Sequence, residues 1–466
     1  MTASPTPRTL GTLLESGYAP RTVKREVRDN LLARLRAGAD PFPGLLGFDE
    51  TVGPHLQRAL LAGHDVVLLG ERGQGKTRLI RSLVGLLDEW IPVVEGCEIN
   101  DEPTAPVCGR CQQLAAALGD ALPIGWRHRS DRYGEKLATP DTSVGDLIGD
   151  VDPIKVAEGR KLGDPETVHY GLVPRTNRGI FSVNELPDLA ERIQVALLNV
   201  LEERDIQVRG YALRLPLDLL LVASANPEDY TNRGRIITPL KDRFGAEIRT
   251  HYPLRLDDEL AVIRQEALLD PEVAVPDHLL EVVARFTRLV RESQAVDQRS
   301  GVSARFAIAA AETVAASALR RAAITGEHPA TARVSDLGGL VETLRGKVEF
   351  EAAEEGREVD VLAHLLRRAV AEVFRARLAG SDLTGLLAHF TEGGTIITGD
   401  LVPAAELLRE VGPVPGLSKL LERLGVAEGS ESPGQAAAAI ELALEGLHLQ
   451  KKLSKDEAGG RAVYGA

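Results

Sequence analysis

The sequence has few aromatic residues and very little methionine or cysteine. Aromatic residues make up 4% of its 466 residues, and the chain contains one Met and three Cys. Aliphatic side chains must therefore supply most of the buried apolar surface. Three cysteines in so long a chain exclude the disulfide framework that holds small secreted domains together. The length is sufficient for two or three domains that each bury a core.

Long hydrophobic runs and an excess of basic residues are also missing. No apolar run is long enough to span a bilayer, and the N-terminus lacks the pattern of a signal peptide, so we expect a cytoplasmic protein with no membrane partner. The formal net charge is −13, which argues against broad electrostatic binding to nucleic acid but is compatible with local basic patches. A hydrophobic content of 44% is ordinary for a soluble globular protein.

One glycine-rich stretch carries a specific chemical pattern. Residues 70–77 have the form G-x-x-x-x-G-K-T of a phosphate-binding loop. An apolar segment at 65–69 precedes it, and the apolar spacing after it predicts a helix over 77–88, which is the context that this loop requires. Backbone N–H groups can then point at phosphate oxygens, Lys76 can reach the β- and γ-phosphates, and the Thr77 hydroxyl can hold Mg²⁺. The candidate nucleotide-binding residues are Gly70, Glu71, Arg72, Gly73, Gln74, Gly75, Lys76 and Thr77.

Further apolar runs predict a parallel α/β sheet with helices on both faces. Residues 179–185 and 219–226 are apolar strands that end in polar side chains, namely Asn184, Glu185 and Asn226, and residues 90–95 predict another strand. Ligands bind at the carboxyl ends of parallel strands, so we expect these side chains beside the phosphate loop. Helical patterns dominate from residue 256 onward, with helices predicted over 257–269, 276–294 and 302–326.

We expect four regions along the chain. They are a helical extension (residues 1–40), an α/β core (41–252), a helical lid region (253–380) and a C-terminal helical region (381–466). The extension contains an amphipathic helix over 21–37. Its polar face could bind an anionic partner, but a solvated face is the interpretation that such a pattern favours. The basic residues of that face are Arg21, Lys24, Arg25, Arg28, Arg34 and Arg36.

The three cysteines form a second candidate site. Cys97, Cys108, Cys111 and His128 lie in a long stretch, residues 96–139, that we expect to be irregular. Three thiolates and an imidazole could complete a tetrahedral zinc site. The spacing is not that of a known zinc finger, and one ligand must come from a distance. The pattern therefore favours the alternative, buried or unpaired thiols.

The phosphate loop and four further elements, in this order, resemble an AAA+ ATPase of the branch that holds the magnesium-chelatase ATPase subunit and the MoxR-type ATPases. The resemblance covers residues 40–325. Residues 179–186, Gly-Ile-Phe-Ser-Val-Asn-Glu-Leu, match the second acidic motif, with Glu185 at the position that activates the attacking water. Residues 142–177 resemble the helix-2 insert of this branch, and residues 207–215 resemble its hairpin before sensor 1. The resemblance implies a fold in which a P-loop AAA+ parallel-sheet domain is followed by a helical lid and a mostly helical C-terminal region.

The resemblance implies roles for three more residues. Asn226, in Ser-Ala-Asn-Pro, matches sensor 1; Arg243, in Leu-Lys-Asp-Arg-Phe-Gly, matches the arginine finger offered to a neighbouring subunit; and Arg305 matches sensor 2 of the lid. The alternative for each arginine is a surface cation. The chain departs from the family at Asn184, where relatives carry Asp near Mg²⁺. An amide can hydrogen-bond a metal-bound water but adds no charge, so we expect the metal to be held less tightly.

The function implied by the resemblance is an ATP-hydrolysing, Mg²⁺-dependent ring motor that remodels a partner protein. We expect a homo-oligomer, specifically a hexameric ring, and a partner with a von Willebrand factor A domain. Asn184 motivates an alternative, a nucleotide-gated assembly module with little hydrolysis. A transcription activator of the AAA+ kind would need a Gly-Ala-Phe-Thr-Gly-Ala loop, which the sequence lacks. Residues 326–466 lie outside the resemblance, so chelatase activity is not implied.

Overall fold

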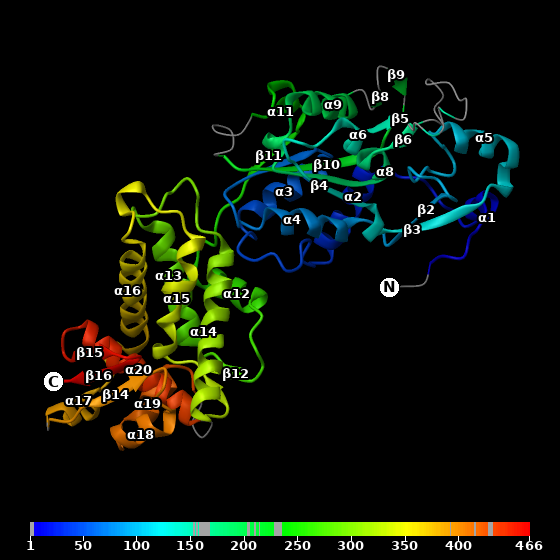
Figure 1. The fold of residues 1–466 in the computed structure, drawn as a ribbon. Coiled ribbons are helices and arrows are strands. Elements are labelled where there is room, and N and C mark those ends of the chain that lie inside the picture. Colours follow the sequence, from blue (N-terminus) through cyan, green and yellow to red (C-terminus); the bar gives the residue numbers. More distant parts are fainter. Residues whose placement is uncertain are drawn as a thin grey trace. The chain divides into compact units, whose positions relative to one another are not determined.

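The chain forms two compact units, Met1–His251 and Tyr252–Ala466 (Figure 1). The computed structural model describes residues 4–151, 154, 157, 168–202, 206–208, 211–213, 215–227, 235–391, 393–413, 416–426 and 432–466. Separate apolar clusters fill the two units. In these residues no helix is long and apolar enough to cross a membrane. The finer division into four regions remains a prediction.

A five-stranded parallel sheet organises the first unit, as predicted. Its strand order is β11 (Ala246–Arg249), β1 (Val66–Leu69), β10 (Leu219–Ala225), β7 (Gly179–Asn184) and β4 (Tyr133–Leu137). In the register of the pairs, Leu69 lies opposite Ala225, and Ala223 lies opposite Val183. The carboxyl ends of β1, β10 and β7 therefore meet at one edge of the sheet.

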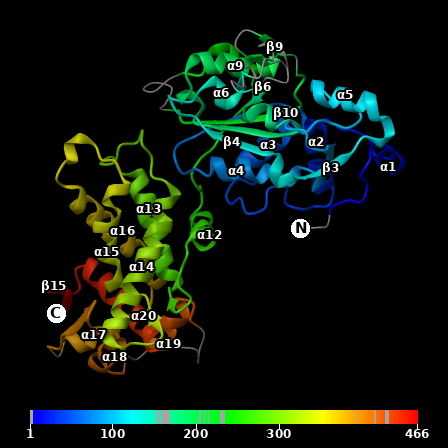
Figure 2. The same cartoon turned by 45° about the vertical axis from the view of Figure 1, so that its right-hand side comes forward.

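Helices cover both faces of this sheet, which confirms the second part of the prediction. Figures 1 and 2 both show α9 (Glu191–Glu202) on one face, and α3 (Val52–Leu61) and α4 (Lys76–Ser82) on the other. Successive residues of β1 alternate between the two apolar clusters. Val67 and Leu69 belong to the cluster that includes Leu197 of α9, whereas Val66 and Leu68 belong to the cluster that includes residues of α3 and α4. A strand buried on both sides is continuously apolar, as the sequence of β1 is.

The stretch between the first two predicted strands differs from the prediction. Residues 96–139, expected to be irregular, contain α5 (Gly109–Leu118), β3 (Ile124–His128) and β4. The strand predicted at 90–95 is β2 (Trp90–Val94), but it pairs antiparallel with β3 rather than joining the central sheet. The edge strand β4, Tyr-Gly-Glu-Lys-Leu, was missed because it has no apolar run. The remaining elements of this unit are α1 (Leu10–Glu15), α6 (Val144–Leu147), β5 (Gly149–Val151), β6 (Val168–Tyr170), α8 (Leu172–Arg175), β8 (Ile206–Val208), β9 (Tyr211–Leu213) and α11 (Thr238–Arg243).

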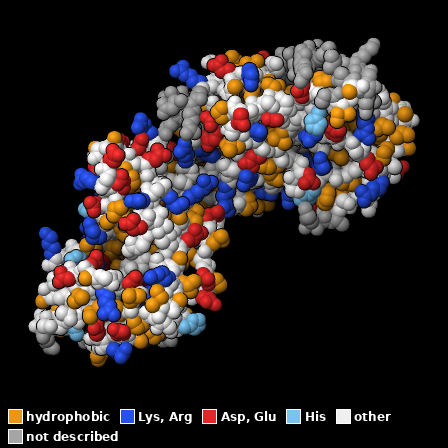
Figure 3. Space-filling view, in the orientation of Figure 1, with side chains coloured by type: hydrophobic (Ala, Val, Ile, Leu, Met, Phe, Trp, Pro, Cys, Tyr) orange, Lys and Arg blue, Asp and Glu red, His pale blue; other side chains and the backbone are white. Residues whose placement is uncertain are grey.

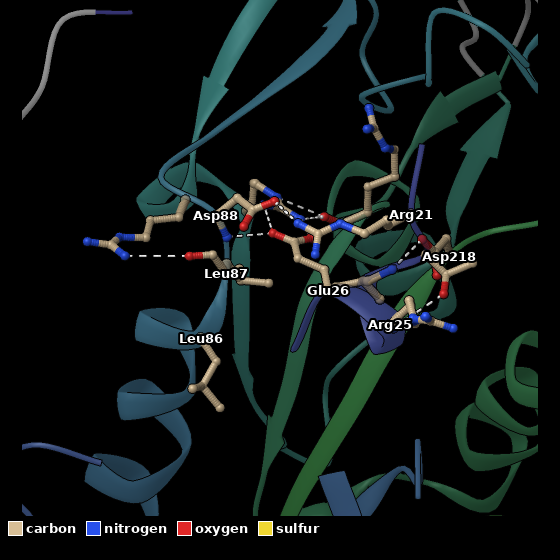
Figure 4. A network of polar contacts seen from close by, with 12 residues as sticks. Arg21, Arg25, Glu26, Leu86, Leu87, Asp88 and Asp218 are labelled. Carbon is tan, nitrogen blue, oxygen red and sulfur yellow. Dashed lines mark hydrogen bonds and ion pairs between the residues drawn. The ribbon is translucent and has the colours of Figure 1, made fainter. Parts of the chain in front are cut away.

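The N-terminal helix α2 (Val23–Arg36) is joined to the unit by a buried ion pair. Arg132 donates to both carboxylate oxygens of Glu26, at 2.8 and 2.6 Å. Glu26 also accepts from the Asp88 backbone N–H at 2.6 Å, a contact shown in Figure 4. Removal of one partner of such a pair typically costs about 3–5 kcal/mol. Arg21 and Lys24 of the predicted basic face pair with Asp88 and Asp65 of the core, so part of that face faces acidic residues.

The second unit is mostly helical, as predicted, with one small sheet. A single apolar cluster runs through its described residues. Its helices are α12 (Leu256–Glu266), α13 (Asp277–Glu292), α14 (Ala304–Thr325), α15 (Gly339–Leu344), α16 (Glu358–Leu378), α17 (Thr384–Thr391), α18 (Ala404–Val411), α19 (Leu417–Arg423) and α20 (Pro433–Leu449). The short strands β12 (Val273–Ala274) and β13 (Ala330–Thr331) pair with each other. The small sheet consists of β14 (Ile396–Gly399), which pairs antiparallel with β16 (Arg461–Gly465), and β15 (Ser454–Ala458), which also pairs with β16.

Candidate functional site

The phosphate-loop sequence lies between β1 and α4, in the predicted strand–loop–helix context. Gly73 and Gly75 have φ of 73° and 77°, a left-handed conformation that favours glycine. Gly70 is required for a different reason, because a Cβ there would collide with the side chains of Thr250 and Gln74. Thr250, just after β11, donates to the Gln74 side chain at 2.7 Å. This hydrogen bond connects the loop to the end of β11, the strand that neighbours β1 on the side opposite β10.

Lys76 begins a hydrogen-bonded chain of three side chains. Its buried ammonium donates to the carbonyl oxygens of Gly70 and Glu71 at 2.5 and 2.8 Å, and to Asn226 Oδ1 at 2.8 Å. Asn226 Nδ2 in turn donates to Glu185 Oε2 at 2.9 Å. These bonds fix the orientation of the amide, since one end must accept and the other must donate. Three residues far apart in the sequence therefore meet at the carboxyl edge of the sheet.

Asn184 is paired with a carboxylate that the sequence analysis missed. Its Nδ2 donates to Glu135 Oε1 at 2.6 Å, and its Oδ1 accepts from the Ser224 hydroxyl at 3.2 Å. Glu135 lies on β4, opposite Ser182 of β7. The resemblance leads us to expect a carboxylate at position 184. The chain has an amide there, and a carboxylate on the neighbouring strand is bonded to it.

Glu135 is held in its charged form by its surroundings. Burial raises the pKa of this carboxyl, but hydrogen bonds from Arg81, Tyr133 and Asn184 outweigh burial and leave the pKa below its usual value. Arg81 Nε donates to Glu135 Oε2 at 2.9 Å, and the Tyr133 hydroxyl donates to the same oxygen at 3.0 Å. The site therefore contains a carboxylate that is ionised at neutral pH.

Glu185 has an unusual backbone that directs its side chain. Its φ of 56° and ψ of 48° place it in the left-handed region, directly after β7. A non-glycine residue in this conformation carries strain of roughly 1–3 kcal/mol and is often found at functional sites. Its backbone N–H donates to the Ser224 hydroxyl at 3.4 Å. Ser224, buried in β10, thus contacts both Asn184 and Glu185, and nothing in an apolar strand sequence distinguishes it.

Arg243 lies at the end of α11 and is not part of this chain of contacts. Its side chain is 46% exposed and forms an ion pair with Glu202 at the end of α9. The approach to α11 is fixed by Gln194, a buried residue that the sequence analysis missed. Gln194 donates to the Arg235 carbonyl at 3.0 Å and accepts from the Ile237 N–H at 2.9 Å. The role of Arg243 as an arginine finger remains a prediction.

The other predicted functional elements are only partly described. Arg305 lies in the first turn of α14, in the second unit, and its role as sensor 2 remains a prediction. In the hairpin predicted over 207–215, β8 and β9 pair antiparallel as expected, whereas Gly210 at its turn lies outside the described residues. Most of the polar part of the insert predicted over 142–177 also lies outside them, although β5 and β6 pair at its two ends.

The three cysteines come together, but His128 does not join them. Cys97, Cys108, Cys111 and Asp101 each offer one ligand atom, and these atoms lie within 4.8 Å of one another. His128 instead contacts the Ser130 hydroxyl at 2.7 Å and packs edge-on against Trp90. His128 is therefore not placed to be the fourth ligand, and the three cysteines are free thiols, two of them buried, as the favoured interpretation expected. The local fold between Cys97 and Cys108 supplies a carboxylate in its place.

The chain is similar in sequence to magnesium-chelatase subunits. It is 28% identical over 242 residues to the magnesium-chelatase 38 kDa subunit of Cereibacter sphaeroides, which covers 50% of this chain and 65% of the relative. It is 30% identical over 252 residues to the magnesium-chelatase subunit ChlI of Nostoc sp., covering 51% and 61%. The matches therefore span less than two thirds of these relatives. No protein-family model matches the chain.

Solved structures give weaker similarity. The BchI–BchD complex of magnesium chelatase aligns at 18% identity, covering 88% of this chain and 95% of that chain, with a TM-score of 0.35. The RuvB branch-migration motor of Thermotoga maritima aligns at 14% identity over 97% and 93%, also with a TM-score of 0.35. Scores this low carry no argument about the fold, which is established by the sheet order and the loop described above. In sequence the chain is similar to magnesium-chelatase subunits, and its first unit is an α/β domain with a five-stranded parallel sheet and a phosphate-loop sequence.

Proposed function

We propose that the chain binds ATP with Mg²⁺ at residues 70–77 and hydrolyses it to ADP and phosphate. The observation that carries this proposal is the hydrogen-bonded chain from Lys76 through Asn226 to Glu185. It joins a cation suited to the phosphates to a carboxylate suited to orienting water. The relatedness to magnesium-chelatase subunits supports the same activity.

Each residue of this edge has a definite role in the proposal. Lys76 binds the β- and γ-phosphates, and the backbone N–H groups of the loop bind their oxygens. Glu185 orients the attacking water and accepts its proton. Asn226 holds the Glu185 carboxylate in position and can bond the γ-phosphate once Lys76 has turned to it. In the proposal, Glu185 at the end of β7 and Asn226 at the end of β10 therefore both act on the γ-phosphate and the water that attacks it.

The residues at this edge also fit a magnesium ion. Mg²⁺ prefers oxygen ligands and keeps several of its waters, so a hydroxyl and an outer carboxylate are suitable partners. Thr77 would supply the hydroxyl, and Asn184 and Glu135 would hold metal-bound waters. Bound Mg²⁺ supplies positive charge that neutralises the phosphates. Because Glu135 restores the negative charge that Asn184 lacks, hydrolysis is favoured over the alternative of an assembly module with little turnover.

We also propose that the chain works as a homo-oligomeric ring, hexameric by analogy with its family, that remodels a partner protein. The relatives are subunits of a larger enzyme, and the exposed Arg243 suits a role at an interface with a neighbour. A partner with a von Willebrand factor A domain remains the expectation from the resemblance. The net charge of −13 argues against nucleic acid as that partner. Figure 3 shows acidic as well as basic side chains on the face that it draws.

The first prediction concerns nucleotide binding. Lys76→Ala should reduce ATP affinity by at least about 100-fold, because it removes the cation that serves the phosphates. Titration calorimetry with MgATP measures this directly. Lys347→Ala is the matched control, since Lys347 is an exposed lysine of the second unit. Equal ATP affinity in the Lys76 variant and the control would contradict the assignment of the loop.

The second prediction concerns the carboxylate of Glu135 beside Asn184. Glu135→Gln keeps the shape of the side chain but removes its charge, so the Mg²⁺ concentration for half-maximal hydrolysis should rise about tenfold, the size of one charge-assisted hydrogen bond. The Mg²⁺ dependence of nucleotide affinity should shift in the same direction. Both quantities are measured by titrating Mg²⁺ at fixed ATP.

A charge swap provides the control for this prediction. Asn184→Asp combined with Glu135→Gln returns the carboxylate to the family's position and keeps one amide and one carboxylate in contact. The double variant should need no more Mg²⁺ than the wild type. If Glu135→Gln alone leaves the Mg²⁺ requirement unchanged, Glu135 has no part in the metal shell.

The third prediction concerns catalysis between subunits. Arg243→Ala chains and Glu185→Gln chains should each be inactive but should regain activity when mixed. In a mixed ring, some interfaces combine an intact Glu185 from one chain with an intact Arg243 from its neighbour. The recovered activity should fade on dilution, because it requires assembly. Mixed rings that form, as shown by light scattering or native mass spectrometry, but hydrolyse no ATP at any ratio would contradict the arginine-finger role.

A further inference from the structure

A cluster of three cysteines and one aspartate lies in the insert between β2 and β3. Cys97 follows β2, Cys108 is the N-cap of α5, and Cys111 is in the first turn of that helix. Asp101 joins them from the loop between Cys97 and Cys108. The ligand atoms of these four residues all lie within 4.8 Å of one another. The cluster contains all three cysteines of the chain.

The aspartate is buried without enough partners. Asp101 has 0% exposure. Its Oδ2 accepts from the Cys108 backbone N–H at 3.0 Å, whereas its Oδ1 has no hydrogen-bond partner among the described residues. A buried carboxylate oxygen without a partner costs several kcal/mol unless a cation or a proton compensates it. A cation bound here would give this oxygen its partner.

Two of the three sulfurs accept hydrogen bonds from the backbone. The Asp101 backbone N–H donates to Cys97 Sγ, and the Cys111 backbone N–H donates to Cys108 Sγ, each at 3.4 Å. N–H donors to sulfur stabilise the charged form and orient metal ligands. Two of the three sulfurs thus already have such a donor.

We propose that Cys97, Cys108, Cys111 and Asp101 bind one zinc ion in a closed tetrahedral site. Three soft thiolates select zinc over magnesium or calcium, and a carboxylate oxygen is an accepted fourth zinc ligand. With Zn–S bonds of about 2.3 Å, tetrahedral sulfurs lie roughly 3.8 Å apart, so the side chains need to move inward by about 1 Å at most. The ion would also supply Asp101 Oδ1 with its missing partner.

A disulfide is the competing fate of these thiols, and the aspartate argues against it. A disulfide between any two of the cysteines would leave Asp101 Oδ1 buried and unpaired, with one thiol beside it. A divalent cation satisfies all four ligands together. The net charge of the loaded site would equal that of the common zinc site with four cysteines, since a carboxylate replaces one thiolate.

The zinc ion would stabilise a part of the insert that supports the catalytic strand. Asn100, next to Asp101, donates to the Arg175 carbonyl at 2.8 Å, and Asn177 donates to the Ile99 carbonyl at 2.9 Å. Residues 175–178 lead directly into β7, whose far end carries Asn184 and Glu185. Zinc would therefore hold the loop after β2 against the start of β7. Its role in this proposal is structural, because all four positions are taken by protein ligands.

Metal analysis of the full chain, purified without chelator, tests the proposal. We expect about one zinc per chain in the wild type. Asp101→Ala should lose most of it, and His128→Ala, the matched control, should keep it. Chelator-treated wild type titrated with Co²⁺ should develop the thiolate-to-cobalt absorption and the strong visible bands of a tetrahedral site. Removal of zinc should lower the melting temperature.

The outcomes that overturn the proposal are equally definite. They are a wild type with neither zinc nor a thiolate–cobalt spectrum, a stable disulfide among the three cysteines in the native protein, or loss of zinc in His128→Ala with retention in Asp101→Ala. Cys108→Ser is less decisive alone because Cys108 also caps α5. The cobalt titration uses the unaltered chain and does not depend on the folding of any variant.

Discussion

The parallel register of β1, β10 and β7 is the constraint on which the site depends. It places the residues that follow these strands at one edge of the sheet, so that Lys76, Asn226 and Glu185 can form a continuous chain of hydrogen bonds. If the register of any strand pair shifted by one residue, each side chain of the shifted strand would move to the opposite face of the sheet, and so from one apolar cluster to the other. All four residues of β1 are buried, two in each cluster, so such a shift would require both clusters to repack. The same packing that stabilises the first unit therefore fixes the geometry of the candidate site.

A second feature of the site is a carboxylate that lies beside the amide of Asn184. Position 184 has an amide, and the neighbouring edge strand provides the carboxylate of Glu135 at 2.6 Å from it. Arg81 and Tyr133 keep that carboxylate ionised. In the proposed mechanism the electrostatic environment of Mg²⁺ is thereby preserved although the motif has changed. A departure from a family motif is therefore best interpreted together with the side chains that touch it.

The sequence predicted the elements with strong local signals and missed those that depend on tertiary contacts. The apolar runs of β1, β7 and β10, the phosphate loop, and the helices α12, α13 and α14 were predictable because their patterns are local. β4 was not, because its residues are mostly polar, and Glu135 was missed with it. Asp101 was missed for a related reason: the spacing of the cysteines gives no indication of which residue the loop turns inward. Ser224 and Gln194 are ordinary polar residues whose importance comes only from their partners.

The measurement that tests the central claim most directly is ATP binding and hydrolysis by Glu185→Gln beside the wild type. Glu185 is held by Asn226, and its carboxylate is the group proposed to orient the attacking water. The account predicts that the variant binds MgATP with the affinity of the wild type and hydrolyses it at least about 100-fold more slowly, the usual loss for a general base. Unchanged hydrolysis in the variant, or no hydrolysis by the wild type above the Lys76→Ala background at saturating Mg²⁺, would contradict the account.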